Sequence, residues 1–277
     1  MDLARAVAFV EANGTEQERA RLHWLVDAVP PGPAIRASLA ALQDAGGGFP
    51  LGMTPGQPTS VDSALTSLWW IEELGQLESP LAGRACAYLR SVQQADGGWD
   101  EDPALAHYDL PPWVQVGHLP TRLYLAAYAA YWLGRRGEMG QPAFLRALDF
   151  LRPHQDETGR FHGYLHTTWI ATSAFLLAGP AEDRVSDRGL QALLDLPLGE
   201  WEDSQLAWAL SCLGPAGLPA AHPFAAQALD ALGLRQRPDG SWASEDGDSY
   251  AVGATIQVLG VLTRYGRLTA PSSRPTG

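Results

Sequence analysis

The sequence predicts an all-α protein, an (α/α)6 barrel of repeated helix pairs. A short motif, Gln-x-x-x-Gly-x-aromatic, recurs between segments whose apolar residues follow helical spacing, and strand patterns are scarce. The copies are QDAGGGF at 43–49, QQADGGW at 93–99, QDETGRF at 155–161 and QRPDGSW at 236–242, with a variant, DLPLGEW at 195–201, that has Asp195 in place of Gln. The repeating unit is therefore a helix, a turn and a second helix.

A first helix is expected before each motif. These segments are 34–42, 82–92, 142–151, 187–196 and 224–234. A more aromatic second helix follows each motif after a loop of variable length. Short polar residues stand just before these second helices and are predicted to be their N-caps: Asp62-Ser63, Pro120-Thr121, His166-Thr167, Asp203-Ser204 and Asp248-Ser249.

The N-terminal segment 4–29 is predicted to be a sixth pair that has lost the motif and is broken at Asn13-Gly14. The predicted repeats are 4–29, 34–75, 82–137, 142–179, 187–214 and 224–266. The pair count and the lack of polar capping repeats favour a closed ring over an open solenoid. We expect one toroidal domain over 1–268 and a disordered tail at 269–277.

Composition excludes several classes of function. The formal charge of −12 and a pI near 4.9 argue against a nucleic-acid partner, which needs a basic surface. All 19 basic residues are arginine, which excludes a P-loop and Schiff-base chemistry, because both need a lysine amine. Two cysteines are too few for a disulfide scaffold, and no transmembrane segment is apparent. We expect a cytoplasmic protein, free or peripheral at a membrane surface.

The repeated turn resembles the QW repeat of the terpene cyclase and prenyltransferase superfamily. This superfamily includes squalene-hopene and oxidosqualene cyclases, class II diterpene cyclases and the β subunits of protein prenyltransferases. The resemblance covers about residues 34–266. It implies an alpha-alpha toroid in which the motif is structural: the Gln amide caps helix ends, the Gly permits the turn and the aromatic ring stacks over the amide. The five turn aromatics are then expected at one end of the barrel.

The resemblance also implies an isoprenoid-handling enzyme with class II, protonation-initiated chemistry on a polyprenyl substrate. Class II cyclases begin with a D-x-D-D motif whose middle aspartate protonates the substrate. The nearest match is EDGDSYA at 245–251, with Asp248 as the proton donor and Asp246 as its neighbour. The alternative role for Asp248 is a simple helix cap. No cofactor and no metal site are expected, apart from Mg²⁺ if a diphosphate is bound.

The second helices carry aromatic side chains that suit an apolar isoprenoid, since aromatic faces stabilise carbocations. We expect about half of them to reach the cavity and the rest to pack in the core. The nine aromatics are Trp69, Trp70, Tyr124, Tyr128, Tyr131, Trp132, Trp169, Phe175 and Trp208. The predicted substrate-binding residues are Trp69, Tyr124, Tyr128, Trp132, Trp169, Trp208, His166, Asp62, Asp203 and Arg122, the last as a partner for a diphosphate.

Other functions remain open from the sequence. One is a non-catalytic isoprenoid-binding or helical-repeat interaction protein. A homodimer or a helical partner subunit stays open for each of the functions considered. A second is a prenyltransferase β-like subunit, although the only metal-like spacing is His162 and His166. A third is an inverting (α/α)6 glycosidase with two mouth carboxylates. The long insert at 100–120 is predicted to be a lid over the barrel mouth or a dimer contact.

Overall fold

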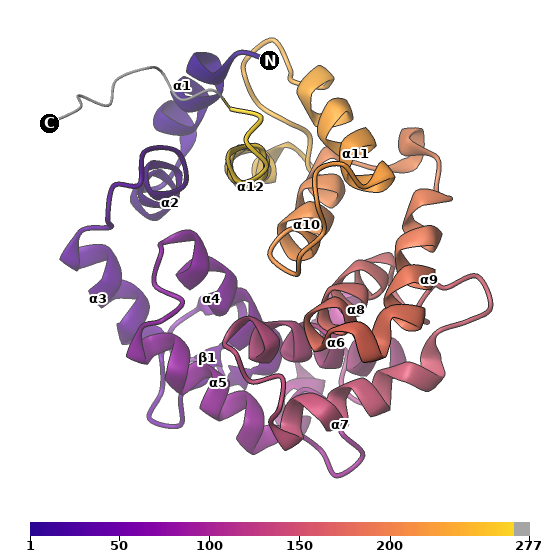
Figure 1. Ribbon diagram of the computed structural model, residues 1–277. Coiled ribbons are helices and arrows are strands. Elements are labelled where there is room, and N and C mark those ends of the chain that lie inside the picture. Colours follow the sequence, from indigo (N-terminus) through magenta and orange to yellow (C-terminus); the bar gives the residue numbers. More distant parts are fainter. Residues whose placement is uncertain (269–277) are drawn as a thin grey trace, which may run out of the picture.

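Within residues 1–268, which the computed structural model describes, twelve α-helices alternate between an outer and an inner layer of one ring (Figure 1). The outer helices are α1 (Leu3–Asn13), α3 (Pro33–Leu42), α5 (Pro80–Val92), α7 (Pro142–Leu151), α9 (Asp183–Leu194) and α11 (Pro223–Leu234). The inner helices are α2 (Glu16–Asp27), α4 (Val61–Glu73), α6 (Leu119–Arg135), α8 (Leu165–Ala178), α10 (Asp203–Leu213) and α12 (Ala251–Arg264). The predicted (α/α)6 barrel is confirmed. The predicted disordered tail, 269–277, lies outside the described residues.

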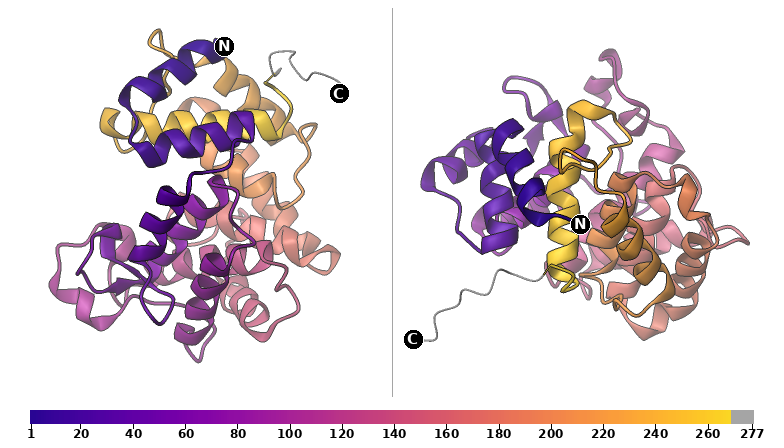
Figure 2. Two further views of the ribbon diagram at one scale, coloured as in Figure 1. Left: turned by 90° about the vertical axis from the view of Figure 1, so that its left-hand side faces the viewer. Right: turned by 90° about the horizontal axis from the view of Figure 1, so that it is seen from above.

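The ring is closed by the first and last helix pairs. Helix α12 packs against both α1 and α2, and α2 packs in turn against α4. Figure 2 shows the indigo N-terminal helices beside the yellow C-terminal helix. The inner helices α6 and α8 form the most extensive contact of the ring and are apolar on nearly all faces, as buried helices are.

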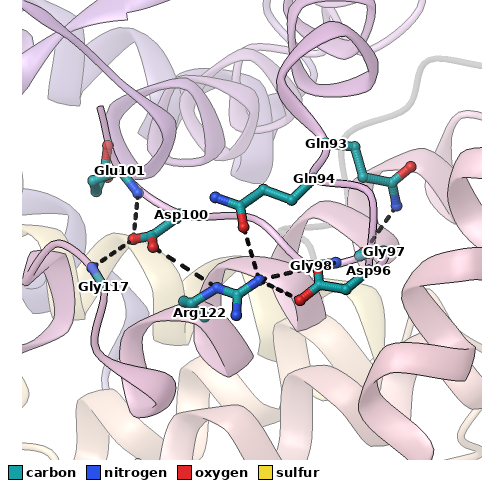
Figure 3. Close-up of polar contacts among 9 residues, drawn as sticks. All are labelled: Gln93, Gln94, Asp96, Gly97, Gly98, Asp100, Glu101, Gly117 and Arg122. Atoms are coloured by element: carbon teal, nitrogen blue, oxygen red, sulfur yellow. Dashed lines mark hydrogen bonds and ion pairs between the residues drawn. The ribbon is translucent and has the colours of Figure 1, made fainter. Parts of the chain in front are cut away.

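The repeated motif ties neighbouring outer helices together. The side-chain amide of Gln93 donates to the carbonyl of Gly97 in its own turn (Figure 3) and to the carbonyl of Ala143 in the first turn of α7, each at 2.9 Å. Gly97 has φ +92°, and a Cβ there would lie 2.4 Å from the carbonyl oxygen of Arg146. The motif therefore joins one outer helix to the next, and the predicted capping of helix ends by the Gln amide is wrong.

The variant fifth motif is held differently. Asp195 replaces the glutamine, and its carboxylate binds the amide of Gln191 on its own helix. The side chain of Arg235, at the end of α11, donates instead to the carbonyls of Trp201 and Leu198 at 2.8 and 2.6 Å. An arginine of the next repeat thus replaces the missing Gln bridge.

The turn aromatics share one end of the barrel, as predicted, because each lies where the chain passes from an outer to an inner helix. All five are buried: Phe49, Trp99, Phe161, Trp201 and Trp242. The indole N–H of Trp99 donates to the carbonyl of Leu89, and that of Trp242 to Leu232. The rings of Trp99 and Trp242 therefore fix the C-terminal ends of their own outer helices.

The predicted N-caps of the inner helices are wrong. The cap of α4 is Ser60, and those of α6, α8 and α10 are His118, Tyr164 and Glu202. Helix α12 begins later than predicted, after a 3₁₀ turn at Asp248–Tyr250. The early start of α4 follows from a short antiparallel pair, β1 (Phe49–Pro50) with β2 (Thr59–Ser60), which ends at its cap. Asp62 and His166 therefore lie in first turns, where their side chains need not cap a helix.

No helix within residues 1–268 has both the length and the apolar character needed to cross a bilayer.

Candidate active site

The lumen of the ring holds a pocket of about 530 Å³, lined by residues from all six inner helices. Its polar lining comes from the first turns of these helices and from the loop before α12: Glu18, Asp62, His166, Ser204, Ser244, Glu245, Asp246, Ser249 and Tyr250. Its deeper wall is formed by Arg21, Thr66, Trp69, Trp70, Trp208, Gly253, Ala254 and Gln257. The volume falls in the range of small-molecule sites.

The deeper wall is aromatic. The rings of Trp69 and Trp208 are parallel within 7°, with centroids 6.5 Å apart, and Tyr124 meets Trp208 edge-on at 6.5 Å. Asp62 and Trp69 are seven residues apart on α4, which corresponds to about two helical turns, or roughly 10 Å along the axis. The pocket therefore places a carboxyl group at one end and faces of aromatic rings at the other.

Asp62 is the carboxyl group at the polar end. Its Oδ1 accepts a hydrogen bond from the hydroxyl of Tyr124, 3.1 Å away on α6. Burial raises the pKa of Asp62 to about 6, although the Tyr124 hydroxyl opposes this effect. A carboxyl with such a pKa is partly protonated near neutral pH, so it can act as a general acid.

A second carboxyl group, that of Glu101, lies behind Asp62. Glu101 is 2% exposed, and it binds the backbone N–H groups of Val61 and Asp62 and the hydroxyl of Ser60, all within 2.9 Å. Burial raises the pKa of Glu101, its hydrogen bonds lower it, and the nearby Asp62 carboxyl raises it further, with a net upward shift. The start of α4 thus carries two carboxyls with raised pKa values.

One arginine lines the pocket. Arg21 is 4% exposed, and its guanidinium lies 5.4 Å from the ring centre of Trp69 and 6.0 Å from that of Trp70. Its Nε donates to the carboxylate of Glu73 at 2.7 Å, and a second guanidinium nitrogen contacts the same oxygen. Burial raises the pKa of Glu73 and the charge of Arg21 lowers it. The effect of burial is larger, so the pKa of Glu73 is raised. The charge of Arg21 is therefore committed to a buried pair.

A histidine lies on the opposite side of the pocket. His166 Nε2 lies 3.1 Å from a carboxylate oxygen of Glu245, whose other oxygen accepts from the amide of Gln205 at 2.7 Å. Burial raises the pKa of Glu245, but these partners outweigh it and the net shift is downward. Burial and the adjacent Glu245 raise the pKa of Asp246. Glu245 is therefore ionised, while Asp246 holds its proton more strongly than a free aspartate.

Five of the ten predicted substrate-binding residues line the pocket: Trp69, Tyr124, Trp208, His166 and Asp62. Four of the nine inner-helix aromatics line the pocket: Trp69, Trp70, Tyr124 and Trp208. This number is close to the predicted half. Tyr128, Trp132 and Trp169 are at most 2% exposed and belong to the core between the helices. They are excluded from the lumen because α6 and α8 also bury the faces that meet the outer ring.

Asp203 and Arg122 lie outside the pocket lining. The Asp203 carboxylate accepts from Arg235 and from the backbone N–H of Ala243. The guanidinium of Arg122 lies between Gln94 and Asp96 on one side and Asp100 on the other (Figure 3). Both residues hold turns together, so Arg122 is committed to acidic partners and is not available to a diphosphate.

The two predicted catalytic residues have different positions. Asp246 lines the pocket. The side chain of Asp248 is 85% exposed, pairs with Arg237 at 2.7 Å and is absent from the pocket lining. It begins the 3₁₀ turn and makes no side-chain cap. The geometry therefore supports neither predicted role of Asp248, because a proton donor must face the substrate.

The insert at 100–120 reaches the pocket through Trp113, which lines it and is 40% exposed. The insert has a small apolar core of its own, formed by Leu105, Leu110 and Val114. Its Pro112 carbonyl accepts a hydrogen bond from the hydroxyl of Tyr164 at 2.6 Å. The insert is thus anchored beside the pocket.

Sequence reasoning placed Asp62 among the binding residues and did not identify it as the acid of a cyclase. The signal was present in SVDS at 60–63, which opens an inner helix and keeps the middle aspartate of the D-x-D-D spacing, with serines at the flanking positions. Glu101 carried no such signal, because its partners lie about 40 residues away along the chain.

No protein-family model matches the chain. The squalene–hopene cyclase of Bradyrhizobium diazoefficiens is 32% identical over 82 residues, which are 30% of this chain and 12% of that enzyme. A probable squalene–hopene cyclase of Sinorhizobium fredii matches with the same identity and coverage. The matched region thus spans about an eighth of the length of these curated relatives.

Solved structures match almost the whole chain. The type II terpene cyclase MstE from Scytonema, in complex with geranylgeranyl dihydroxybenzoate, superposes with a TM-score of 0.63 at 19% identity, covering 95% of this chain and 96% of that one. A protein from Actinoplanes gives 0.66 at 19% identity, covering 95% and 98%. The ent-copalyl diphosphate synthase of Streptomyces platensis gives 0.58 at 18% identity, covering 91% of this chain and 50% of that one. The chain therefore has the fold of the terpene cyclases, as the repeated turn predicted.

Proposed function

We propose that this chain is a type II terpene cyclase that protonates a carbon–carbon double bond of a polyprenyl substrate, with Asp62 as the acid. The observation that carries the proposal is the position of Asp62, a carboxyl with a raised pKa at one end of an aromatic pocket. The fold shared with type II cyclases supports it.

In the proposed reaction the Asp62 carboxyl transfers its proton to the terminal double bond of the chain. The electron pair of that bond forms the new C–H bond, and a tertiary carbocation remains, while Asp62 becomes a carboxylate. Internal double bonds then attack successive cations and close the rings. The last cation loses a proton or is captured by the head group. Trp69, Trp208 and Tyr124 present aromatic rings that stabilise such cations without reacting as water would.

The charge of the pocket argues for a substrate that lacks a diphosphate. Four carboxyl groups line the pocket: Glu18, Asp62, Glu245 and Asp246. The lining arginine is neutralised by its buried pair with Glu73. We therefore propose a prenyl chain with an uncharged or cationic head group, and a reaction without Mg²⁺.

The other functions have less support. The zinc site of a prenyltransferase needs a cysteine, and both Cys86 and Cys212 are buried in the core, where burial raises the thiol pKa. A sugar-binding pocket would be expected to carry more polar groups along its deep wall. The two unpaired cysteines are compatible with a reducing compartment such as the cytoplasm.

The proposal is tested by incubating the protein separately with squalene, geranylgeraniol and geranylgeranyl diphosphate, and analysing the products by mass spectrometry. Cyclisation gives an isomer of unchanged mass and altered retention. We expect turnover of a substrate without diphosphate, a loss of about 100-fold or more in Asp62→Asn, and near-parental activity in Asp248→Asn. Asn keeps the size of the side chain and can accept the Tyr124 hydrogen bond, but it cannot donate the proton. Undiminished cyclisation by Asp62→Asn would refute this assignment.

A further inference from the structure

Glu101 connects the start of α4 to the next repeat of the barrel. Its Oε1 accepts from the Ser60 hydroxyl at 2.9 Å and from the N–H of Asp62 at 2.8 Å, and its Oε2 accepts from the N–H of Val61 at 2.8 Å. Both oxygens are therefore directed at the free amides of the helix that carries the proposed acid.

The backbone of Glu101 is itself held in place. The carboxylate of Asp100 accepts from the N–H of Glu101 and from that of Gly117, each at 2.9 Å, which joins the two ends of the insert (Figure 3). The Nε of Arg122 lies 3.8 Å from the other oxygen of Asp100. The position of Glu101 against α4 is thus fixed by contacts on its far side from the pocket.

The hydrogen bonds indicate where a single proton would lie in this pair of carboxyls. Glu101 accepts three hydrogen bonds, and the Asp62 carboxyl accepts one, from Tyr124. Hydrogen-bond donors and a helix N-terminus favour the ionised form of a carboxyl. When the pair holds one proton, Glu101 is therefore the carboxylate and Asp62 keeps the proton, next to the pocket.

Resting on the cyclase function proposed above, we infer that Glu101 is a positioning residue for the reaction, which orients Asp62 toward the pocket and keeps the proton on it by carrying the negative charge of the pair. Burial raises the pKa of both groups, and the charge of whichever carboxyl ionises first raises the pKa of the other. Two interacting carboxyls lose their protons in sequence, so the pair holds one proton between the two steps.

The surroundings do not neutralise this pair. Across the pocket, Arg21 of α2 is paired with Glu73, and His166 of α8 is paired with Glu245. The other titratable groups nearby are acids or phenols: Glu18 of α2, Tyr124 of α6, Asp246 in the loop before α12, and Tyr88 of α5, whose pKa is raised by burial and by Glu101. A negative charge on Glu101 therefore acts on Asp62 without a competing cation among these groups.

The first experiment compares cyclisation by the parent protein, Glu101→Gln and Ser60→Ala from about pH 5 to pH 8.5. Gln cannot carry the charge, so we expect Glu101→Gln to lose activity mainly above about pH 7, in kcat and not in KM, by about tenfold for each pKa unit of interaction. Ser60→Ala removes one contact to Glu101 and leaves the charge, so its loss is expected to be the same at every pH. An equal loss at all pH values in Glu101→Gln would overturn the inference.

The second experiment needs no turnover and so separates this inference from the proposed function. The infrared carbonyl band of protonated carboxyls is titrated in the parent protein and in Asp62→Asn. We expect Asp62→Asn to lose the carboxyl that titrates in the second step, and the remaining one, Glu101, to titrate in the pH range of the parent's first step, because Asp62 is uncharged during that step. A downward shift of the Glu101 titration in Asp62→Asn would overturn the inference, because it would show that Asp62 loses its proton first, and this result can be obtained even where Glu101→Gln fails to fold. Absence of cyclisation together with an unshifted Glu101 titration would leave it standing.

Discussion

The side-chain amide of Gln236 donates to the backbone carbonyl of Asp2 across 2.8 Å and so joins the last repeat to the first. The same amide donates to the carbonyl of Gly240 at 3.0 Å, and the Gln236 side-chain oxygen accepts the N–H of Asp2. Gln93 bridges two interior repeats with the same donor geometry. The ring is therefore closed by the contact that also links its successive repeats.

Replacing Gln236 with alanine should weaken this closure. The loss of these hydrogen bonds is expected to lower the free energy of unfolding by about 1–2 kcal/mol, and to increase amide hydrogen exchange in α1. Gln191→Ala is the matched control, since that amide binds only the Asp195 carboxylate on its own helix. Chemical denaturation and hydrogen-exchange mass spectrometry measure the two effects. Equal destabilisation by both changes would show that the Gln236 bridge does not close the ring.

Gly97→Ala is expected to be strongly destabilising. Its φ is +92°, and a Cβ would approach the Arg146 carbonyl oxygen to 2.4 Å, so the turn must shift away from α7. We expect a loss of about 2–4 kcal/mol in the free energy of unfolding. Gly199→Ala, in the variant fifth motif, has open space around the added Cβ and should change stability by less than about 0.5 kcal/mol. Similar thermal melting of the two variants would contradict this account of the turn.

Asp62→Asn should stabilise the protein at high pH while it abolishes cyclisation. The pKa of Asp62 is raised in the folded protein to about 6, so the folded state binds this proton more tightly than the unfolded chain. The free energy of unfolding of the parent therefore falls as pH rises from about 4 to about 6. Asn escapes this loss, so we expect the variant to be more stable by about 1–2 kcal/mol near pH 8, since Asp62 is only half-buried. Near pH 4 the gain should vanish, and denaturation at both pH values checks this.

Trp69 and Gln257 lie between the main pocket and a second cavity of about 90 Å³, because both residues line both cavities. Trp69→Leu should join the two cavities and favour longer chains. Trp70→Leu is the control, because Trp70 lines only the main pocket and its ring also lies beside Arg21. Conversion of squalene relative to geranylgeraniol is expected to rise in Trp69→Leu alone. A parallel rise in both variants would assign the effect to the loss of contact with Arg21.

The sequence alone determined the helix pairs, their turns and the kind of fold. The Gln-x-x-x-Gly turn is local: the glutamine, the glycine with positive φ and the aromatic residue lie within seven positions, and the copies repeat in register. Such a pattern can be recognised without knowing what packs against it. Closure could also be expected from the number of repeats, although the contact from Gln236 to Asp2 spans nearly the whole chain.

Only the tertiary structure decided which carboxyl faces the lumen. Asp62 and Asp248 look alike in sequence, each near the start of an inner helix and each followed by serine. The structure places Asp62 against Tyr124 and Glu101, both from the next repeat, and leaves Asp248 exposed beside Arg237. A raised carboxyl pKa depends on desolvation and on neighbouring groups, and these are set by contacts distant in the sequence. The local pattern could therefore identify both aspartates as candidates, but it could not decide which of them faces the lumen.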